Sequence, residues 1–348
     1  MMGKKIKFNW YLLGGVLSFV AALTVAVMAI FSNLNQLVGD DLLIPAQELP
    51  VSCEQRRGVD GLCYEGIEPA LFGVMIDNHA VARPAAGLSR ASLVYETVVE
   101  APITRFLAIF YRQEALTKIG PVRSARPFYV DWMKEFDVPY LHVGGSNEAL
   151  ELLNNSYGYD LNEFYNGQYF LRDAKRSAPH NVFTSDEKIG QALTDKKWML
   201  KNNFSAWVFK DEAELSVRGL VKRLNFSFGS EMVSWSYDRE KNQYSRVLGD
   251  KIVTDEEGGE IIAKNLVFMR TNKKVIDDYG RLQVKTLGSG EAIVYLDGLS
   301  IPAEWRRSSS GERTRFFEKE SGLEIAFNSG TTWIEVSDQR DRLPIEIN

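Results

Sequence analysis

Arginines and carboxylates embedded in apolar segments are the residues best suited to chemistry in this sequence. Between residues 77 and 131 they are Arg83, Arg90, Glu96, Glu100, Arg105, Arg123 and Arg126. A charged group among buried apolar residues is costly to desolvate unless it is paired or contacts a ligand. Two interpretations stay open. Either Glu96 and Glu100 pair with Arg105 or Arg126 as internal braces, or the arginines converge on an anionic ligand, which guanidinium groups bind bidentately.

The loop at 119–127, IGPVRSARP, is a candidate anion site. Pro121 and Pro127 restrict the backbone on both sides of Arg123, and Ser124 is a predicted N-cap for the following helix. A rigid turn that leads into a helix N-terminus presents free N–H groups, and arginines beside it favour an anion. Residues 142–150, HVGGSNEAL, repeat this order, but Gly-Gly before a helix is most often only a tight turn.

The chain has three histidines, His79, His142 and His180, each beside turn residues. Their spacing does not predict a zinc site, so hydrogen-bonded structural roles are favoured. No GxSxG motif is present, and we predict no metal and no cofactor. An enzyme of the cell envelope is the alternative, with Glu96, Glu100 or Asp131 as acid or base.

The predicted ligand-binding set lies wholly between residues 83 and 180, and no catalytic residue is assigned within it. The set is Arg83, Glu96, Glu100, Arg105, Arg123, Ser124, Arg126, His142 and His180. In the enzymatic alternative, His142 or His180 assists the carboxylates.

These residues need a mixed α/β framework to bring them together. Strands are predicted at 71–76, 93–99, 103–111 and 139–145 from their β-branched and aromatic content. Helices are predicted at 124–136, 146–153 and 184–193. Ser146 is the expected N-cap of the second, and Thr184 with Glu187 has capping-box spacing in the third. Residues 56–200 are therefore predicted to form an N-terminal α/β domain.

The pattern changes to alternating apolar and polar residues in the second half of the chain. Short alternating segments separated by turn residues predict a β-rich, mainly antiparallel C-terminal domain at 225–348. Residues 201–224 are the expected joint, with a helix-like stretch at 213–224. The fold class is therefore α+β.

An apolar run at 10–31 is long enough to cross a bilayer, which needs about 20 residues. Lysines precede it and Asp40 and Asp41 follow it, so residues 1–9 are predicted to be cytoplasmic and the rest extracytoplasmic. Residues 32–55 would form a stalk in this single-pass arrangement. A cleaved signal peptide is the alternative, although the run is longer than a typical h-region.

The cysteines and the overall charge narrow the class of protein further. Cys53 and Cys63, the only cysteines, predict one disulfide in an oxidising compartment, and a two-cysteine metal site is the weaker alternative. The net charge of −5 lacks the basic excess that binding to nucleic acid requires, so no nucleic-acid partner is predicted.

Several motifs carry a family resemblance. They are RPAAGLSRASLVYE (83–96), ITRFLAIF (103–110), IGPVRSARPFYVDW (119–132), HVGGS (142–146), APHNVFTS (178–185), GSGEAIVYLDG (288–298), AEWRR (303–307) and NSGTTWIEV (328–336). In this order they resemble the YerB-like family of bacterial envelope lipoproteins, a domain family of unknown function. The resemblance implies a two-domain layout and no catalytic residue. A lipid-bearing cysteine directly after the apolar run is absent here, so a transmembrane helix would replace the lipid.

The function expected from these features is binding. We predict a membrane-anchored extracytoplasmic protein whose N-terminal domain holds an anionic or glycan-like envelope ligand. The alternatives are the envelope hydrolase or transferase described above and a scaffold that recruits a protein partner.

Overall fold

The computed structural model describes residues 53–100, 103–113, 115–228, 231–278 and 280–347, together with Met28. The predicted transmembrane segment at 10–31, apart from Met28, lies outside these residues, as do residues 1–9 and the predicted stalk up to residue 52. Within the described ranges, no helix has the length and apolar character needed to cross a membrane. Residues 54–348 form one compact unit.

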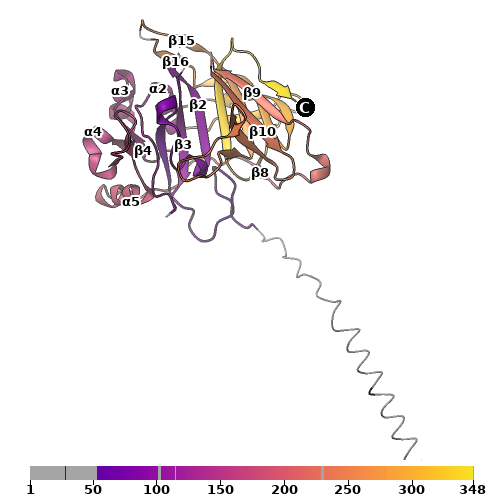
Figure 1. Ribbon diagram of the computed structural model, residues 1–348, viewed down its shortest axis with the longest axis horizontal. Helices are drawn as coiled ribbons and strands as arrows, with labels where there is room; N and C mark the ends of the chain where they lie inside the picture. Colours follow the sequence, from indigo (N-terminus) through magenta and orange to yellow (C-terminus); the bar gives the residue numbers. More distant parts are fainter. Residues whose placement is uncertain are drawn as a thin grey trace, which may run out of the picture. The chain divides into compact units, whose positions relative to one another are not determined.

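A ten-stranded sheet runs through the centre of this unit (Figure 1). In spatial order it contains β19 (Arg315–Glu318), β18 (Leu299–Arg307), β17 (Gly288–Leu296), β14 (Asn265–Thr271), β21 (Thr332–Asp338), β2 (Leu93–Glu100), β3 (Ile103–Tyr111), β1 (Leu71–Asp77), β4 (Tyr140–His142) and β5 (Asp160–Asn162). The halves of the chain meet where β21 pairs in parallel with β2, from Leu93 opposite Thr332 to Glu96 opposite Glu335.

A second sheet is built only from the later part of the chain. Its strands are β12 (Lys251–Ile252), β11 (Gln243–Leu248), β10 (Glu231–Asp238), β9 (Arg223–Phe228) and β22 (Ile345–Ile347), with β13 (Ile262–Ala263) paired to β11. Three short pairs complete the strands: β15 (Lys273–Val275) with β16 (Leu282–Val284), β8 (Phe209–Lys210) with β20 (Phe327–Asn328), and β6 (Leu171–Arg172) with β7 (Val182–Phe183).

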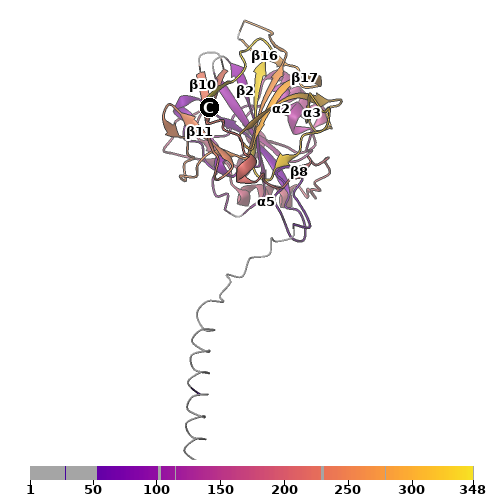
Figure 2. The same ribbon diagram turned by 90° about the vertical axis from the view of Figure 1, so that its right-hand side faces the viewer.

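The described helices all lie before residue 200, apart from one 3₁₀ turn. They are α2 (Pro127–Met133), α3 (Asn147–Ser156), α4 (Glu163–Asn166) and α5 (Asp186–Asp195), with 3₁₀ turns at Ala80–Ala82, Leu88–Arg90, Gly167–Tyr169 and Leu215–Val217. Figure 1 shows α3, α4 and α5 beyond β4, on the side away from β9 and β10. Figure 2, turned by 90°, shows α2 and α3 on one side of the sheet and β10 and β11 on the other.

The ten-stranded sheet carries an apolar core on each face because side chains alternate along its strands. On β2, Tyr95 packs with Trp132 of α2 in one core, and its neighbour Val94 belongs to the other core with Trp235 of β10. Successive side chains of β2 and β3 therefore point to opposite faces of the sheet. This alternation decides which of the predicted site residues can meet.

For two of the three predicted helices, the observed N-cap differs from the predicted one. Ser146 accepts a hydrogen bond from the backbone N–H of Ala149, which confirms it as an N-cap. For α5 the cap is Ser185, whose side chain accepts from Lys188, and not Thr184. Ser124 does not cap α2, because Pro127 opens that helix two residues later than predicted and Arg126 holds the cap position without a side-chain bond.

The expected sequence of a mixed α/β part and a β-rich part is present in the structure. The helix predicted at 213–224 is wrong: only Leu215–Val217 form a 3₁₀ turn, and β9 begins at Arg223. Arg218 lies between these elements, and the backbone N–H groups of Gly219 and Lys222 bond to the distant carbonyls of Asp297 and Ile347, so tertiary contacts replace helical bonds there. Strands from both sides of the predicted joint at 201–224 share the ten-stranded sheet.

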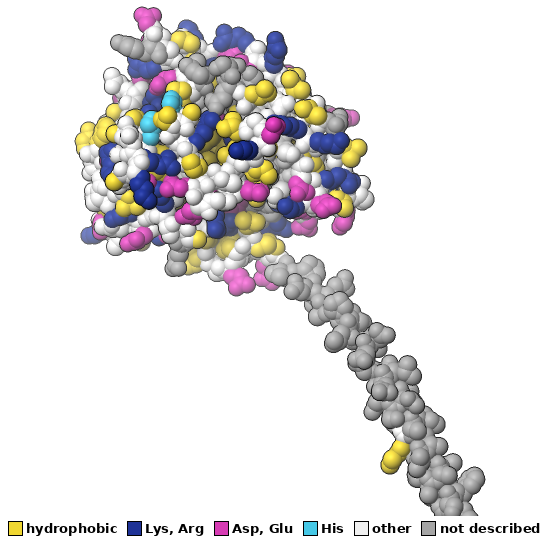
Figure 3. Space-filling view, viewed as in Figure 1, with side chains coloured by type: hydrophobic (Ala, Val, Ile, Leu, Met, Phe, Trp, Pro, Cys, Tyr) yellow, Lys and Arg dark blue, Asp and Glu magenta, His cyan; other side chains and the backbone are white. Residues whose placement is uncertain are grey.

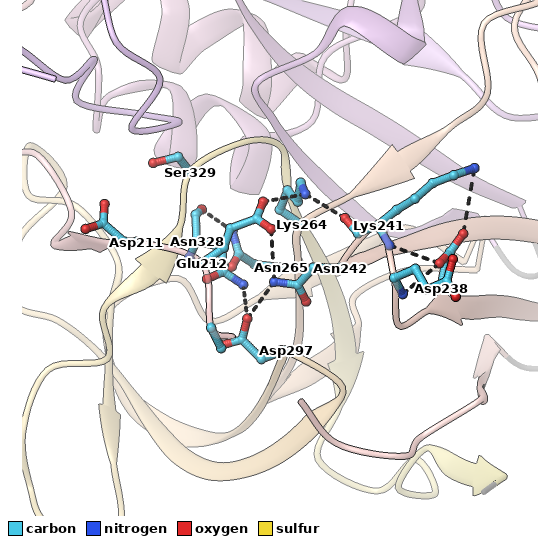
Figure 4. A network of polar contacts seen from close by, with 12 residues as sticks. Asp211, Glu212, Asp238, Lys241, Asn242, Lys264, Asn265, Asp297, Asn328 and Ser329 are labelled. Atoms are coloured by element: carbon cyan, nitrogen blue, oxygen red, sulfur yellow. Dashed lines mark hydrogen bonds and ion pairs between the residues drawn. The ribbon is translucent and has the colours of Figure 1, made fainter. Parts of the chain in front are cut away.

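A buried polar network ties the second half of the chain together (Figure 4). Asp297, at the turn between β17 and β18, accepts hydrogen bonds from Lys210 at 2.6 Å, Asn242 at 2.7 Å and Asn328 at 2.8 Å. Burial acts to raise the pKa of Asp297, but these hydrogen bonds hold it below its usual range. The network joins four separate turns and strands, which is a structural role.

Cys53 and Cys63 are joined in a disulfide, as predicted, and neither is free. Within the loop that they close, the Arg57 guanidinium donates to Asp60, and the amide of Gly61 bonds to the carbonyl of Arg57. The two-cysteine metal site is therefore ruled out.

Candidate functional site

Most of the predicted site residues lie near the carboxyl ends of strands of the ten-stranded sheet, a region here called the carboxyl edge. Strands β1, β2, β4 and β5 point the same way, so their carboxyl ends share that edge. Asp77 ends β1, Glu100 ends β2, and His142 ends β4. The loop at 119–127 packs along the end of β1, where Val122 pairs with Ile76. Crevices at the carboxyl ends of strands are common ligand sites in open α/β sheets.

Arg105, Arg123 and Arg126, here called the arginine cluster, gather at this edge. The Arg105 side chain, 4% exposed, donates to the backbone carbonyl of Ser124 at 2.9 Å and lies 4.0 Å from Glu100. Arg126 forms an ion pair with the same oxygen of Glu100. Arg123 Nε lies 3.0 Å from Asp77 Oδ2. The three guanidinium groups thus meet two carboxylates, of which Glu100 is 43% exposed.

The electrostatics of the cluster favour a further negative charge. The pKa of Arg105 is lowered to about 10, first by burial and then by the like charges of Arg126 and Arg123, which outweigh Glu100 and Asp77. The Nε groups of Arg105 and Arg126 are buried and find no hydrogen-bond partner among the described residues. Although burial acts to raise it, the pKa of Glu100 is lowered, chiefly by Arg126. A buried donor without an acceptor is costly, so the cluster would gain from an anionic ligand.

Asp77 is a central residue of this edge that the sequence did not single out. It is 2% exposed, and its Oδ2 lies 2.6 Å from Nδ1 of His180 as well as near Arg123. The His79 ring stacks on that of His180 with centroids 5.3 Å apart. Figure 3 shows histidine side chains next to Lys and Arg side chains on the viewed face. In the sequence, the motif IDNH at the end of a predicted strand could have pointed to Asp77 as a site residue.

Glu96 does not join the arginine cluster, because its side chain points to the opposite face of the sheet. It is fully buried and accepts from Arg246 at 2.7 and 3.1 Å, from Thr104 at 2.7 Å and from Asn78 at 3.1 Å. The first predicted interpretation, internal bracing, describes Glu96, but the partner of Glu96 is Arg246 and neither Arg105 nor Arg126. Arg83 approaches this group by donating to Asn78 Oδ1 at 3.0 Å. Glu100 pairs with Arg126, as that interpretation predicted.

Three other candidates are occupied by structural contacts. His142 is fully buried, with Nδ1 2.7 Å from the carbonyl of Gly144 and Nε2 2.6 Å from Asp160. Asp131 on α2 accepts from Thr286 at 3.0 Å. Ser124 contributes its backbone carbonyl to Arg105. Among the acids and bases named for the enzymatic alternative, Glu100 and His180 lie at the carboxyl edge.

The fold places the chain in the class of α+β proteins, with an N-terminal α/β part and a β-rich part that share one central sheet. This chain belongs to the YerB-like family. The model for the N-terminal domain of "Protein of unknown function (DUF3048)" matches residues 65–199, and the model for the C-terminal domain matches residues 223–334.

One relative is similar along nearly the whole chain. "Putative lipoprotein YerB" of Bacillus subtilis (strain 168) is 30% identical over 315 residues, which span 85% of this chain and 94% of the relative. The crystal structure of YerB protein from Bacillus subtilis superposes with a TM-score of 0.73 at 28% identity, covering 82% of this chain and 97% of that chain.

Proposed function

We propose that this chain is a membrane-anchored extracytoplasmic protein that binds a small anionic ligand at the arginine cluster. The observation that carries the proposal is the excess of guanidinium over carboxylate at the carboxyl edge, with buried Nε groups that lack an acceptor. Like charges held together in a desolvated site cost free energy that a bound anion offsets. Carboxylates, phosphates and acidic glycans all match a guanidinium fork.

The location part of the proposal rests on the N-terminal sequence and on the relative. The apolar run at 10–31, preceded by lysines and followed by acids, favours a single span with residues 32–348 outside. The relative from Bacillus subtilis is named as a lipoprotein, which is a membrane-anchored class. The disulfide fits an oxidising compartment.

Thermal melting of the full chain with and without added anions tests ligand binding. A ligand that binds only the folded state raises the melting temperature, by an amount equivalent to about 2.7 kcal/mol at a hundredfold excess over Kd. We expect phosphate, citrate or an acidic glycan fragment to stabilise the wild type. Arg126→Lys should lose most of this shift, because an ammonium group keeps the charge but cannot form the bidentate fork.

The matched control is Arg340→Lys, which changes an arginine that is 77% exposed and lies outside the edge. It should keep the full anion-dependent shift. No shift in the wild type with any of the three anions, together with a large loss of stability in Arg126→Lys, would assign the cluster to bracing the fold alone.

A further inference from the structure

A buried charged group lies where the end of α2 meets the loop between β18 and β19. Arg307 ends β18, Arg313 belongs to the loop, and Glu135 follows α2. All three side chains are fully buried. Arg307 Nε lies 3.5 Å from Oε1 of Glu135, and Arg313 Nε lies 3.4 Å from Oε2 of the same carboxylate. Two guanidinium groups therefore share one carboxylate inside the protein.

Neighbouring side chains do not supply the missing negative charge. Arg307 donates to three backbone carbonyls of the surrounding segments, which carry no net charge. The carboxylate of Asp131 lies 3.9 Å from Lys134, and Arg315 in β19 forms an ion pair with Glu324. The buried group is therefore left with an excess of one positive charge among the described residues. An unpaired charge in the interior is costly.

The shared carboxylate is already occupied by hydrogen bonds from neutral groups. Glu135 accepts from Thr314 Oγ1 at 2.6 Å, from the Thr314 N–H at 3.2 Å and from the Tyr95 hydroxyl at 3.2 Å. Burial and then the charge of Glu135 raise the pKa of Tyr95, so its hydroxyl stays a neutral donor. All three nitrogens of the Arg313 guanidinium, and Nη1 of Arg307, are buried without an acceptor among the described residues. Buried donors of a charged group gain free energy when an acceptor reaches them.

Aromatic rings pack around the Arg313 guanidinium. Its Cζ atom lies 4.2 Å from the centroid of the Trp207 ring and 4.6 Å from that of the Phe136 ring. Such rings attract a cation but offer no hydrogen-bond acceptor for its N–H groups. Burial lowers the pKa of Arg313, although the charge of Glu135 acts to raise it. Because a guanidinium does not lose its proton in proteins, the excess charge has to be met by an anion.

We propose that a buried chloride ion binds Arg313 and Arg307 beside Glu135. One negative charge matches the excess of one positive charge, whereas a divalent anion would leave the group negative. A buried water molecule could accept hydrogen bonds there, but it could not offset the charge. The ion would join the N-terminal part of the chain, through Glu135, to the β-rich part. This site is distinct from the arginine cluster and does not depend on the proposed function.

Bromide can locate the ion directly, because it replaces chloride in most sites and scatters X-rays anomalously. Crystals of the full chain in detergent, grown with sodium bromide, are the sample. We expect an anomalous peak within hydrogen-bonding distance of the guanidinium groups of Arg313 and Arg307. A water molecule at this position without anomalous signal, or bromide found only on the surface, would overturn the proposal.

Urea denaturation in increasing chloride measures what the ion contributes to stability. Ionic strength is held constant with fluoride, whose stronger hydration opposes burial. A ligand that binds only the folded state raises the ratio of folded to unfolded chain in proportion to its concentration above Kd. A tenfold rise in chloride should therefore increase this ratio about tenfold in the wild type.

Two variants separate the buried site from other anion effects. Arg313→Met leaves one cation for one carboxylate, so this variant should fold and lose the dependence on chloride. Arg126→Lys, in the arginine cluster, is the matched control and should keep it. Near-ultraviolet circular dichroism checks the folding of each variant. Dependence that persists in Arg313→Met, or disappears in Arg126→Lys, would show that chloride acts elsewhere.

Glu135→Gln tests the charge balance from the opposite direction. This variant keeps both guanidinium groups and removes the negative charge between them, so chloride should bind more tightly. We expect the chloride concentration that gives half of the stabilisation to fall about tenfold or more. A half-saturating concentration equal to or above that of the wild type would contradict an anion site at this position, even if Arg313→Met failed to fold.

Discussion

Glu96 and Glu335 lie directly opposite each other where β2 and β21 pair, and both approach one guanidinium, that of Arg246. Arg246 Nη1 is 2.7 Å from Glu96 and 3.5 Å from Glu335, and both carboxylates are fully buried. Two carboxylates that share one cation cannot both ionise without cost. Burial first, and then the charge of Glu96, raise the pKa of Glu335 well above its usual value of 4.5. Burial and the neighbouring charge of Glu96 therefore favour the protonated form of Glu335 in the folded protein.

A raised carboxyl pKa makes folding stability fall as the pH rises. The contribution of Glu335 is fully present below its unfolded pKa of about 4.5 and is lost as pH climbs toward the folded value. Glu335→Gln cannot ionise, so the variant should gain stability relative to the wild type as pH rises above 4.5. Melting temperatures of both proteins across pH 5 to 9 measure this difference. A difference that does not change with pH, as expected for the exposed control Glu320→Gln, would contradict it.

Arg246 should be essential for stability, because it is the cation that Glu96 and Glu335 share. Arg246→Met leaves a buried carboxylate uncompensated and should lower the free energy of unfolding by about 3–5 kcal/mol in urea denaturation. The exposed control Arg340→Met should change it by about 0.5 kcal/mol or less. Adding Glu96→Gln to Arg246→Met should restore part of the loss. A loss in Arg246→Met no larger than in the control would mean that the ion pair does not hold the two halves of the sheet.

The disulfide between Cys53 and Cys63 should contribute measurably to stability. In the chain-entropy account, a loop of this length constrains the unfolded state by about 2–3 kcal/mol. The double variant Cys53→Ser/Cys63→Ser should therefore unfold at lower urea than the wild type, and dithiothreitol should shift only the wild type. An unchanged midpoint under reducing conditions would show that the loop is held by its other contacts.

Topology can be tested with an external protease on spheroplasts that express the full chain. If residues 32–348 lie outside the membrane, the protease should remove an epitope tag placed after Asn348 while a tag before Met1 stays protected. Protection of the C-terminal tag until detergent is added would place the folded unit inside the cell. Lysing the cells before treatment provides the control for protease access.

The local structure near the site was largely predictable from the residues. Strands at 71–76, 93–99 and 103–111 appear as β1, β2 and β3, and Ser146 caps α3, because alternation and capping depend on neighbouring residues. The helix-like stretch at 213–224 is not a helix, because the backbone N–H groups of Gly219 and Lys222 bond to the distant carbonyls of Asp297 and Ile347, and these bonds outweigh its local propensity.

The sequence by itself determined the apolar N-terminal run, the disulfide between two near cysteines, and the loop that carries Arg123 and Arg126. Only the tertiary structure decided that Glu96 pairs with Arg246, 150 residues away, and that Arg105 faces the other side of the sheet. Loop closure costs little more for long separations than for short ones, so sequence distance does not indicate a partner. Because side chains alternate along a strand, Glu96 and Arg105 point to opposite faces of the sheet. The pairing of β2 with β21 then places Glu335 beside Glu96.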